Sequence, residues 1–497
     1  MRQVGNDEMV AKKSVVVAQF GEGNFLRAFA DQMIDVANEK GVFDGGVAII
    51  KPIEFGSLDV FRRQNLMYTV ILRGMQSGQK IVDHRVISAI SEVVDPFNDY
   101  EAFLDIAKGE TLRIVVSNTT EAGIVFDKND KLDNHPANTF PGKLTQFLHA
   151  RYEHYRGAKD KGLIMLPCEL IERSGTKLYE CVSKFIKLWN LPEGFADWVK
   201  ESCIFCNCLV DRIVSGYPTG EAESLERDLL GYHDELMVIG EPFGLWVIAS
   251  DRYEEVSKAF PLDAAGLPVV FTDDETPYRD RKVRLLNGAH TSMVLAAYLA
   301  GLDTVDEAMA DPSVRAFIEK VLYGEISPTV KLPTEEVRAF ADSVIERFEN
   351  PFLGHKLLSI ALNSVSKWKS RILPSFKDSL AASGELPECM TFSLAALAAF
   401  YRSSERGDGC LIGKRNASLG ETYEIRDDVN VLDFFAAKSS LPNAEFVQAL
   451  LSNTEFWGED LSVISGMSEK ITEYLDEISS KGMACVIKSL VQRLTNN

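Results

Sequence analysis

The segment SVVVAQFGEGNFLRAFADQMIDVANEKG, residues 14–41, joins a β-branched run, a glycine turn and an amphipathic helix. The run at residues 15–17 is typical of a buried strand. After Gly21 and Gly23, apolar residues recur at the spacing of a helix, at Phe25, Leu26, Phe29, Met33, Ile34 and Val36. The order strand, turn, helix is the first half of a βαβ unit, and it predicts an α/β fold.

The two glycines of this turn allow two interpretations. Gly21 and Gly23 let the backbone approach a pyrophosphate, and the start of a helix offers free N–H groups that carry partial positive charge. Leu26 stands where the dinucleotide fingerprint has its third glycine. The spacing alone therefore leaves dinucleotide binding and an ordinary strand-to-helix turn equally open.

Further apolar runs extend the βαβ pattern. GGVAIIKPIE (45–54) lies where the chain should return to the sheet, and LRIVVSNTTEAGI (112–124) ends in small polar residues. Ligands of doubly wound sheets bind at the carboxyl ends of the strands, which makes Asn118, Thr119 and Glu121 candidate binding residues. Strands are also expected over residues 162–170, 203–214 and 241–250.

Beyond about residue 276 the pattern changes to successive amphipathic helices. These helices are expected over residues 305–323, 334–348, 354–373, 390–402, 430–438, 443–453 and 467–493. The predicted architecture is an N-terminal, Rossmann-like, doubly wound α/β domain over residues 1–276. A mainly α-helical C-terminal domain for substrate and catalysis is expected over residues 277–497.

Charge and hydropathy exclude several classes of partner. The 497 residues carry a formal net charge of −20, which repels nucleic-acid phosphates and anionic lipid. No stretch approaches the ~18 consecutive apolar residues of a membrane span, and the start of the chain lacks a signal-peptide pattern. We expect a cytoplasmic protein that binds neither nucleic acid nor membranes. Monomer and homo-oligomer both stay open.

The eight cysteines are too few and too scattered for a disulfide framework. The densest group, CIFCNC at residues 203–208, lacks a second pair of ligands at the spacing of a zinc site. A buried strand is the better interpretation of this stretch. The sequence therefore predicts no metal site.

Five motifs give the chain a resemblance to a known family: FGEGNFLR (20–27), VDRI (210–213), EPFGLWVI (241–248), KVRLLNGAH (282–290) and SKWKSR (366–371). In this order and at these separations they resemble the polyol-specific long-chain dehydrogenases, the mannitol dehydrogenase family. The resemblance covers nearly the whole chain. It implies hydride transfer without a metal between NAD(H) and a sugar-derived carbonyl. The candidate cofactor-binding residues are Phe20, Gly21, Gly23, Asn24, Phe25, Asn118, Thr119 and Glu121.

The resemblance also implies catalytic roles for three residues. Lys282 would be the general acid in reduction and the base in oxidation, while Asn287 and His290 would orient and polarise the substrate oxygen. Asn287 and His290 are three apart and share a helical face, and Lys282 is expected to precede the helix. Without the family, His290 is typical of a buried core histidine and Lys282 of a surface charge.

Departures from the family pattern bear on the substrate. Polyol members have an asparagine and an arginine where Leu170 and Ser359 align, and both losses favour a small uronate or its aldonate partner over mannitol. Asp211 and Lys367 match residues on the substrate side of the family's site. Arg371, four residues after Lys367 on the same helical face, is a candidate to hold a carboxylate as a fork. A solvated helix face is the alternative.

The nucleotide has two candidates. An acidic residue after the second strand normally binds the ribose of NAD, but here the strand ends in Lys51 and Pro52, with Glu54 just after. The family favours NAD, and Lys51 leaves NADP as the weaker candidate. A sugar-acid binding protein on a dehydrogenase scaffold is the non-enzymatic alternative, although such a protein has no need of a catalytic lysine.

Overall fold

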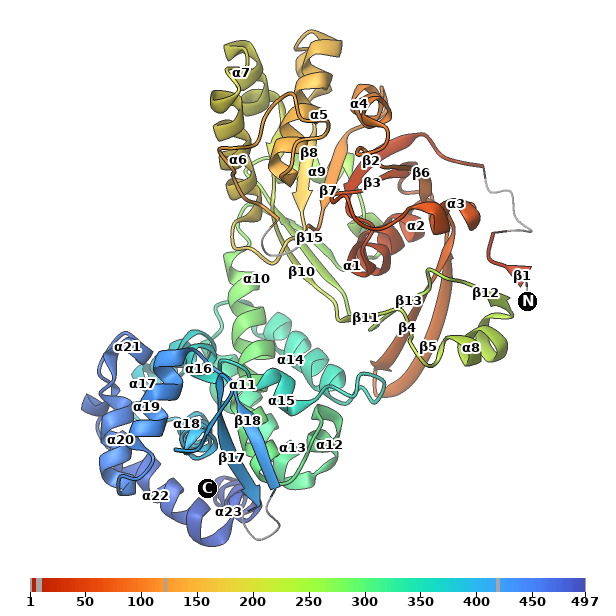
Figure 1. Ribbon diagram of the computed structural model, residues 1–497. Helices are drawn as coiled ribbons and strands as arrows, with labels where there is room; N and C mark the ends of the chain where they lie inside the picture. The colour runs from red at the N-terminus through yellow and green to blue at the C-terminus, as the bar shows by residue number, and fades with distance from the viewer. Residues whose placement is uncertain (1, 6–10, 120–122, 417–420, 497) are drawn as a thin grey trace. The chain divides into compact units, whose positions relative to one another are not determined.

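The computed structural model describes residues 2–5, 11–119, 123–416 and 421–496. The chain forms two compact units, Met1–Thr276 and Pro277–Asn497 (Figure 1). The division falls where the sequence pattern changes from alternating strands and helices to successive helices.

The first unit is built on a six-stranded sheet with strand order β6-β3-β2-β7-β8-β9, in which each neighbouring pair is parallel. Counted along the chain, this order is 3-2-1-4-5-6, the dinucleotide-binding order of the doubly wound fold. The expected Rossmann-type fold is thus confirmed. The strands are β2 (Val15–Phe20), β3 (Gly46–Ile50), β6 (Ile90–Val94), β7 (Ile114–Ser117), β8 (Ile164–Pro167) and β9 (Ile204–Phe205).

Helices follow the strands and cover the sheet. Directly after β2, the segments α1, η1 and α2 run on without a break, and η1 is a stretch of π-helix. The helices beside the sheet are α1 (Asn24–Leu26), η1 (Arg27–Asp31), α2 (Gln32–Glu39), α4 (Tyr100–Lys108), α5 (Phe140–Tyr155), α6 (Ser174–Leu188) and α7 (Glu193–Ser202).

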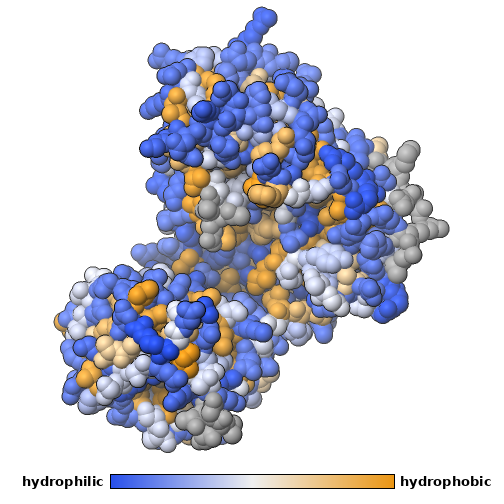
Figure 2. Space-filling model, viewed as in Figure 1, coloured by the Kyte–Doolittle hydropathy of each residue, from blue (hydrophilic) through white to orange (hydrophobic). Residues whose placement is uncertain are grey.

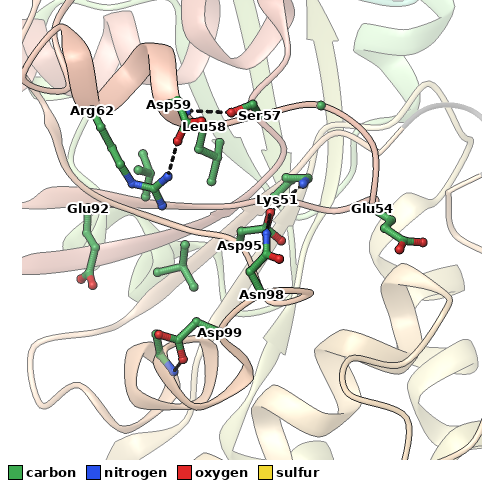
Figure 3. A pocket seen from close by; sticks show the side chains of 14 residues that line it. Lys51, Glu54, Ser57, Leu58, Asp59, Arg62, Glu92, Asp95, Asn98 and Asp99 are labelled. Atoms are coloured by element: carbon green, nitrogen blue, oxygen red, sulfur yellow. Dashed lines mark hydrogen bonds and ion pairs between the residues drawn. The ribbon is translucent and has the colours of Figure 1, made fainter.

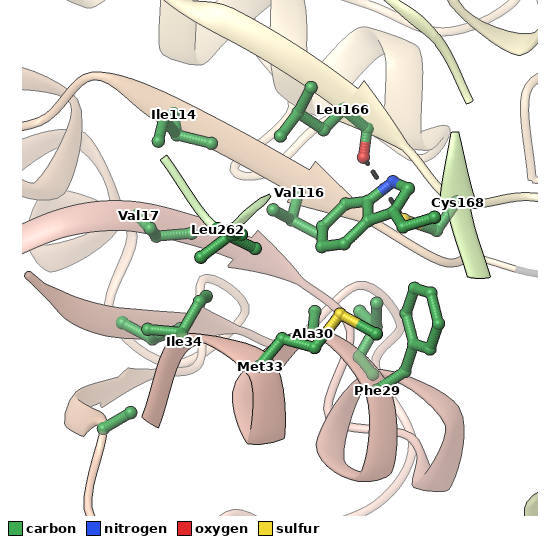
Figure 4. Close-up of a cluster of buried hydrophobic side chains, with 14 of the residues drawn as sticks. Val17, Phe29, Ala30, Met33, Ile34, Ile114, Val116, Leu166, Cys168 and Leu262 are labelled. Carbon is green, nitrogen blue, oxygen red and sulfur yellow. Dashed lines mark hydrogen bonds between the residues drawn. The ribbon is translucent and has the colours of Figure 1, made fainter. Parts of the chain in front are cut away.

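Apolar side chains cover both faces of this sheet. Val17 of β2 packs in one cluster with Met33 and Ile34 of α2, whereas its neighbour Ala18 packs in the other (Figure 4). The alternation arises because successive side chains of a strand point to opposite faces. Since both faces are covered, β3 (GVAII) is buried throughout, as expected for a strand inside a parallel sheet.

The strand expected over residues 203–214 is wrong as a single element. Its parts are β9, β10 (Asn207–Asp211) and β11 (Val214–Gly216), which belong to different sheets. β10 pairs antiparallel with β14 (Leu245–Ala249), and β11 pairs with β13 (Val238–Gly240). The pattern of apolar residues records that these segments are buried, but it does not record which strands they pair with.

In chain order, a long hairpin follows β3 and precedes β6. It was not predicted from the sequence. β4 (Tyr68–Gln76) and β5 (Gln79–Ile87) pair antiparallel over their full length. Both residues of their turn, Ser77 and Gly78, have positive φ, 52° and 72°, as a tight two-residue hairpin turn requires. The remaining elements of this unit include β1 (Arg2–Gln3), α3 (Asp59–Arg63), α8 (Ala222–Leu225), η3 (Glu226–Leu230), β12 (Tyr232–His233), α9 (Tyr253–Ala259) and β15 (Val269–Thr272).

The cysteine cluster lies in this unit. Cys203, Cys206 and Cys208 are buried with free thiols: Cys203 directly precedes β9, Cys206 lies between β9 and β10, and Cys208 lies in β10. CIFCNC is thus buried, as expected, but it forms parts of two strands. Within the described residues, no group of three His, Cys, Asp or Glu side chains is placed to hold a metal ion.

The second unit is mainly helical, as expected. Its helices are α10 (Thr276–Arg281), η5 (Lys282–Asn287), α11 (Gly288–Leu299), α12 (Val305–Ala310), α13 (Pro312–Glu319), η6 (Lys320–Ile326), α14 (Thr334–Phe348), α15 (Leu357–Ile360), α16 (Ser364–Arg371), α17 (Leu373–Ser383), α18 (Glu388–Tyr401), α19 (Val429–Lys438), α20 (Asn443–Leu451), α21 (Thr454–Trp457), α22 (Met467–Lys481) and α23 (Met483–Asn496). A small antiparallel sheet, which the sequence did not predict, consists of β16 (Arg406–Gly407), β17 (Cys410–Asn416) and β18 (Glu421–Ile425).

Several expected helices of this unit are interrupted. Asp311 divides the first, because its carboxylate accepts hydrogen bonds from the first backbone N–H groups of α13. Asn363, with a φ of 54°, lies between α15 and α16 directly before the first residue of α16, and Gly482, with a φ of 81°, separates α22 from α23. The apolar period continues across these breaks and conceals them. The affected predictions are residues 305–323, 354–373 and 467–493.

The surface is mostly polar. On the face shown in Figure 2, hydrophilic residues predominate and apolar residues are scattered. The strongly apolar helices α11 and α18 are buried against one another and have 12 and 14 residues. Among the helices that the structure describes, none has both the length and the apolar character needed to cross a membrane.

Candidate active site

The turn after β2 contains the predicted dinucleotide glycines. Gly21 has a φ of 130°, and a Cβ at this position would lie 3.2 Å from the carbonyl oxygen of Asn118. Both facts require glycine here. Gly23 is exposed, and among the described residues, its chain neighbours aside, no heavy atom lies within 4 Å of where its Cβ would be. The backbone of the turn is therefore open to an approaching group.

The other residues of this turn differ in what they offer. Phe20 is fully buried, and its ring packs against aromatic rings of α4 and α5, so only its backbone reaches the turn. Asn24 is exposed. Phe25 is half-buried and stacks on Phe29 with ring centroids 4.9 Å apart. Sequence reasoning named Phe20 and Phe25 but could not separate the core residue from the accessible one.

A second group of candidate residues follows β7, the neighbour of β2. Asn118 donates from Nδ2 to the carbonyl of Cys168 at 2.7 Å. Thr119 donates from its backbone N–H and its hydroxyl to Oε1 of Glu169, at 3.1 and 3.0 Å. Glu121 lies outside the described residues. β2 and β7 meet where the strand order reverses, which is where doubly wound sheets bind ligands.

Glu169 is a residue of this edge that sequence reasoning missed. Its buried carboxylate also accepts from the hydroxyl of Ser117 at 3.1 Å, so it ties the ends of β7 and β8 together. Burial raises the pKa of the Glu169 carboxyl, although these hydrogen bonds oppose the rise. The signal in the sequence was an acidic residue directly after a buried strand, in LPCEL.

A pocket of about 370 Å³ opens at the carboxyl ends of β3 and β6 (Figure 3). At its base the ammonium of Lys51 bonds to Oδ2 of Asp95 at 2.7 Å, and the two side chains are only 3% and 11% exposed. Lys51 is therefore not the free cation that its position in the sequence suggested. The lining also contains the acidic side chains of Glu54, Asp59, Glu92 and Asp99, and the guanidinium of Arg62, which is paired with Asp59 at 3.0 Å.

Asp211, the predicted substrate-side aspartate, ends β10 in the first unit and is buried. The next residue, Arg212, donates to the backbone carbonyls of Phe243 and Ala28 at 2.9 and 2.6 Å. Asp211 thus shares a unit with the predicted cofactor residues, whereas the other predicted substrate and catalytic residues all belong to the second unit.

Lys282 and Asn287 begin and end a stretch of π-helix, η5, that continues α10 and leads into α11. The expectation that Lys282 precedes the helix is therefore wrong. In an α-helix, residues five apart point ~140° from one another. A π-helix closes its turn between residues i and i+5, and it occurs often at functional sites. The π-stretch therefore separates Lys282 and Asn287 by one π-turn, and Asn287 stands three residues before His290 of α11.

His290 lies in a partly buried, cationic environment. Its ring stacks on Phe348 with centroids 4.1 Å apart, and the ring of His355 lies edge-on at 5.8 Å. Burial and then the nearby charges of His355, Arg347, Arg371 and Lys367 hold the pKa of His290 well below its usual value. His290 is therefore a neutral imidazole at neutral pH, with one nitrogen as donor and the other as acceptor.

Lys367 and Arg371 of α16 approach the same imidazole. Lys367 donates to the carbonyl of Ile360 at 2.9 Å, and Arg371 donates to the hydroxyl of Thr291 at 3.4 Å. Burial lowers the pKa values of both side chains. The close approach of α16 depends on Gly288, where a Cβ would lie 3.3 Å from the carbonyl oxygen of Arg371.

The structure therefore brings His290, Lys367 and Arg371 together and adds residues that sequence reasoning missed. Phe348 and His355 contact the His290 ring directly. His355 stands in NPFLGHK, at the start of the helix expected over residues 354–373, and only its rarity as one of 7 histidines marked it. The sequence marked Phe348 only as an apolar residue on the buried face of the helix expected over residues 334–348.

Comparison with known families decides what this pair of units is. The model of the mannitol dehydrogenase Rossmann domain matches residues 15–258, and that of the mannitol dehydrogenase C-terminal domain matches residues 274–479. The chain belongs to the mannitol dehydrogenase family. Members of this family that are similar to it include altronate oxidoreductases. That of Enterobacter sp. (strain 638) is 43% identical over 95% of this chain and 96% of its own length. That of Bacillus subtilis (strain 168) is 42% identical over 94% and 93%.

Solved structures of two dehydrogenases share the fold. The Pseudomonas fluorescens mannitol 2-dehydrogenase, in a ternary complex with NAD and D-mannitol, is 22% identical and has a TM-score of 0.65, with 99% of this chain and 97% of that chain covered. A D-sorbitol dehydrogenase in substrate-free form is 22% identical with a TM-score of 0.77, covering 98% and 97%. The predicted family is confirmed, and so is the predicted class: the protein is a nicotinamide-linked oxidoreductase. The non-enzymatic alternative is set aside.

Proposed function

We propose that the protein interconverts tagaturonate and altronate with NAD(H), as a step of hexuronate catabolism. The observation that carries the proposal is the group of His290, Lys367 and Arg371, which places two cations beside a neutral imidazole. A hexuronate presents a carboxylate that cations bind and hydroxyls that an imidazole recognises. The similarity to altronate oxidoreductases over nearly the whole chain supports the same substrate pair.

The charge of the whole chain makes the local cations necessary. A net charge of −20 repels an anionic substrate at long range. A uronate enzyme with this charge must therefore concentrate cations where the carboxylate binds. Lys367 and Arg371 meet this requirement because they are partly buried, where a charge-assisted hydrogen bond is weakened less by solvent.

The proposed chemistry requires a proton donor and hydrogen-bond donors at the reacting oxygen. A bound nicotinamide dinucleotide supplies the hydride in reduction and accepts it in oxidation. Lys282 gives its proton to the ketone oxygen as negative charge develops there, and takes the proton back in the reverse direction. Asn287 and His290 donate hydrogen bonds to the same oxygen. Ketone, reduced nucleotide and one proton thus become secondary alcohol and oxidised nucleotide.

The pocket at β3 and β6 supports NAD over NADP. The charge of Lys51 is neutralised by Asp95 and buried, so it is not offered to a 2′-phosphate. Arg62, which also lines the pocket, is paired with Asp59 at 3.0 Å. The carboxylates of Glu54 and Asp99 oppose a phosphate there, and carboxylates can accept hydrogen bonds from the free ribose hydroxyls of NAD.

A substrate panel tests the proposal. Tagaturonate, fructuronate and fructose are each reduced with NADH and with NADPH while the loss of absorbance of the reduced nucleotide is followed. We expect tagaturonate with NADH to give the highest kcat/KM, because the site favours an anion and the nucleotide pocket disfavours a second phosphate. Equal kcat/KM for fructose and tagaturonate would contradict the uronate assignment. Equal values for both nucleotides would contradict the preference for NAD.

The reaction is proposed to need no metal, since a lysine supplies the proton that a metal-bound water supplies elsewhere. We expect prolonged treatment with EDTA followed by its removal to leave the rate of tagaturonate reduction unchanged. The rate before and after treatment is the measurement. A loss of activity that added zinc restores would show this prediction to be wrong.

A further inference from the structure

A cluster of buried polar side chains lies directly beneath the glycine turn of the first unit. Gln19, Asp31 and Tyr68 are fully buried, and Arg27 is nearly so. They come from β2, from η1 and from β4 of the hairpin. Buried polar groups are retained at a cost unless they are hydrogen-bonded, so the arrangement of this cluster calls for an explanation that the catalytic residues do not supply.

Two side chains of the cluster donate hydrogen bonds to the turn. Gln19 donates from Nε2 to the carbonyl of Gly21 at 3.0 Å. Arg27 donates to the carbonyl of Glu22 at 3.2 Å and to Oδ1 of Asn24 at 2.6 Å. Arg27 also donates to the carbonyl of Leu236. The turn is therefore fixed from below by an amide and a guanidinium, while the side of Gly23 stays open.

Asp31 bonds to Gln19 and to Tyr68, and the Tyr68 ring lies against Arg27. Oδ2 of Asp31 accepts from Gln19 at 3.3 Å and from the hydroxyl of Tyr68 at 2.8 Å. The guanidinium of Arg27 lies over the Tyr68 ring, 5.2 Å from its centroid. Within the described residues, Oδ1 of Asp31 and Oε1 of Gln19 are buried and have no hydrogen-bond partner. The cluster has more acceptors than donors, and a proton on Oδ1 supplies a donor.

We infer that Asp31 is a positioning residue for the cofactor, and that the turn binds the pyrophosphate best when the Asp31 carboxyl is neutral. With a neutral carboxyl, Arg27 beneath the turn attracts the pyrophosphate more strongly, because one of the negative charges that act on it is removed. An ionised Asp31 carboxyl, whose charge acts on Arg27, weakens that attraction, because its negative charge partly offsets the positive charge of the guanidinium. The inference rests on the proposed binding of NAD(H) at this turn.

The Asp31 carboxyl changes its charge near neutral pH. Burial raises its pKa to about 7, although Tyr68, Gln19 and Arg27 oppose the rise. The carboxyl is therefore neutral below about pH 7 and ionised above it. Because an anion binds better to the neutral form, the affinity for NADH must fall as pH rises through this value.

Other charged groups face the cluster and define the controls. Asp35 of α2 raises the pKa of Asp31 slightly and is itself bonded to Arg85 at 2.8 Å. Asp234 acts on Arg27. Glu22 lies in the turn, and burial raises the pKa of its carboxyl too. Glu22 is thus the group that could mimic the effect of Asp31, and Glu22→Gln is the matched control.

The experiment is a fluorescence titration of the full-length protein with NADH, without substrate, from about pH 6 to about pH 8.5. We expect the Kd of the unmodified protein to rise about fivefold over this range, which corresponds to somewhat less than one unit of pKa change on binding. Asp31→Asn should keep the low-pH Kd throughout, because it is neutral and of the same shape. Glu22→Gln should retain the rise.

A second variant keeps the inference testable if Asp31→Asn folds poorly. Tyr68→Phe removes a donor that favours the ionised carboxyl, so the rise in Kd should persist with its midpoint at higher pH. An Asp31→Asn protein with the unmodified pH dependence would overturn the inference, as would loss of that dependence in Glu22→Gln. An unmodified protein that binds no NADH at any pH would instead contradict the proposed cofactor.

Discussion

Replacement of Lys282 by alanine is expected to lower kcat/KM for tagaturonate by ~10² or more, the effect typical of losing a general acid. Without the ammonium, water must supply the proton that neutralises the negative charge developing on the substrate oxygen, and this proton transfer is slower. The Kd for NADH should stay nearly unchanged, since the predicted cofactor residues lie in the first unit. Steady-state kinetics and an NADH titration on the same preparation measure both quantities.

Lys331→Ala is the matched control for this experiment. Lys331 is an exposed lysine of the same unit, so its loss changes the net charge equally without touching the proposed chemistry. We expect it to keep kcat/KM within about twofold of the unmodified value. Near-native turnover of Lys282→Ala would remove Lys282 from the mechanism, and an equal loss in Lys331→Ala would attribute the effect to charge alone.

Replacement of Arg371 by glutamine is expected to raise KM for tagaturonate roughly tenfold or more. The change removes a charge-assisted hydrogen bond to the substrate carboxylate, for which about 1.4 kcal/mol is a minimum. Because fructose has no carboxylate, its KM should stay the same in Arg371→Gln. The comparison of KM for the two substrates separates a lost carboxylate contact from a general distortion of the site.

Lys369→Gln provides the control on the same helix. The ammonium of Lys369 lies beside Gly458, next to α21, whereas Arg371 reaches Thr291 of α11. Lys369→Gln should therefore leave both KM values unchanged. An unchanged KM for tagaturonate in Arg371→Gln would refute the carboxylate clamp and leave the uronate assignment to the substrate panel.

Much of the first unit could be predicted because its signals are local. The run at residues 15–17, the glycines at 21 and 23 and the apolar period that follows each depend on a few neighbouring residues. A parallel strand buried on both faces must be apolar throughout, so β3 and β7 were visible in the sequence. The hairpin β4–β5 was missed, since half of β5 is exposed and its alternation is weak.

The candidate site was predictable to the extent that its residues share one helix. Asn287 and His290 are three apart, and Lys367 and Arg371 are four apart, so each pair shares a face by helical geometry. That the second pair approaches His290 depends on Gly288 and on the break at Asn363, which sets where α16 begins. Neither feature follows from the apolar period. His355 contacts the same imidazole from the segment between α14 and α15, where the apolar period predicts the start of a helix instead.

The sequence by itself determined the class of fold, the family and the kinds of side chain available for the chemistry, because periodicity and motif spacing are properties of nearby residues. Only the tertiary structure decided how those side chains act. It places Phe20 in the core and pairs Lys51 with Asp95, and it makes His290 neutral by burial among cations. It also winds residues 282–287 as a π-helix, which separates Lys282 and Asn287 by one π-turn. Burial, charge pairing and helix winding depend on residues far apart in the chain, and a sequence pattern does not carry that information.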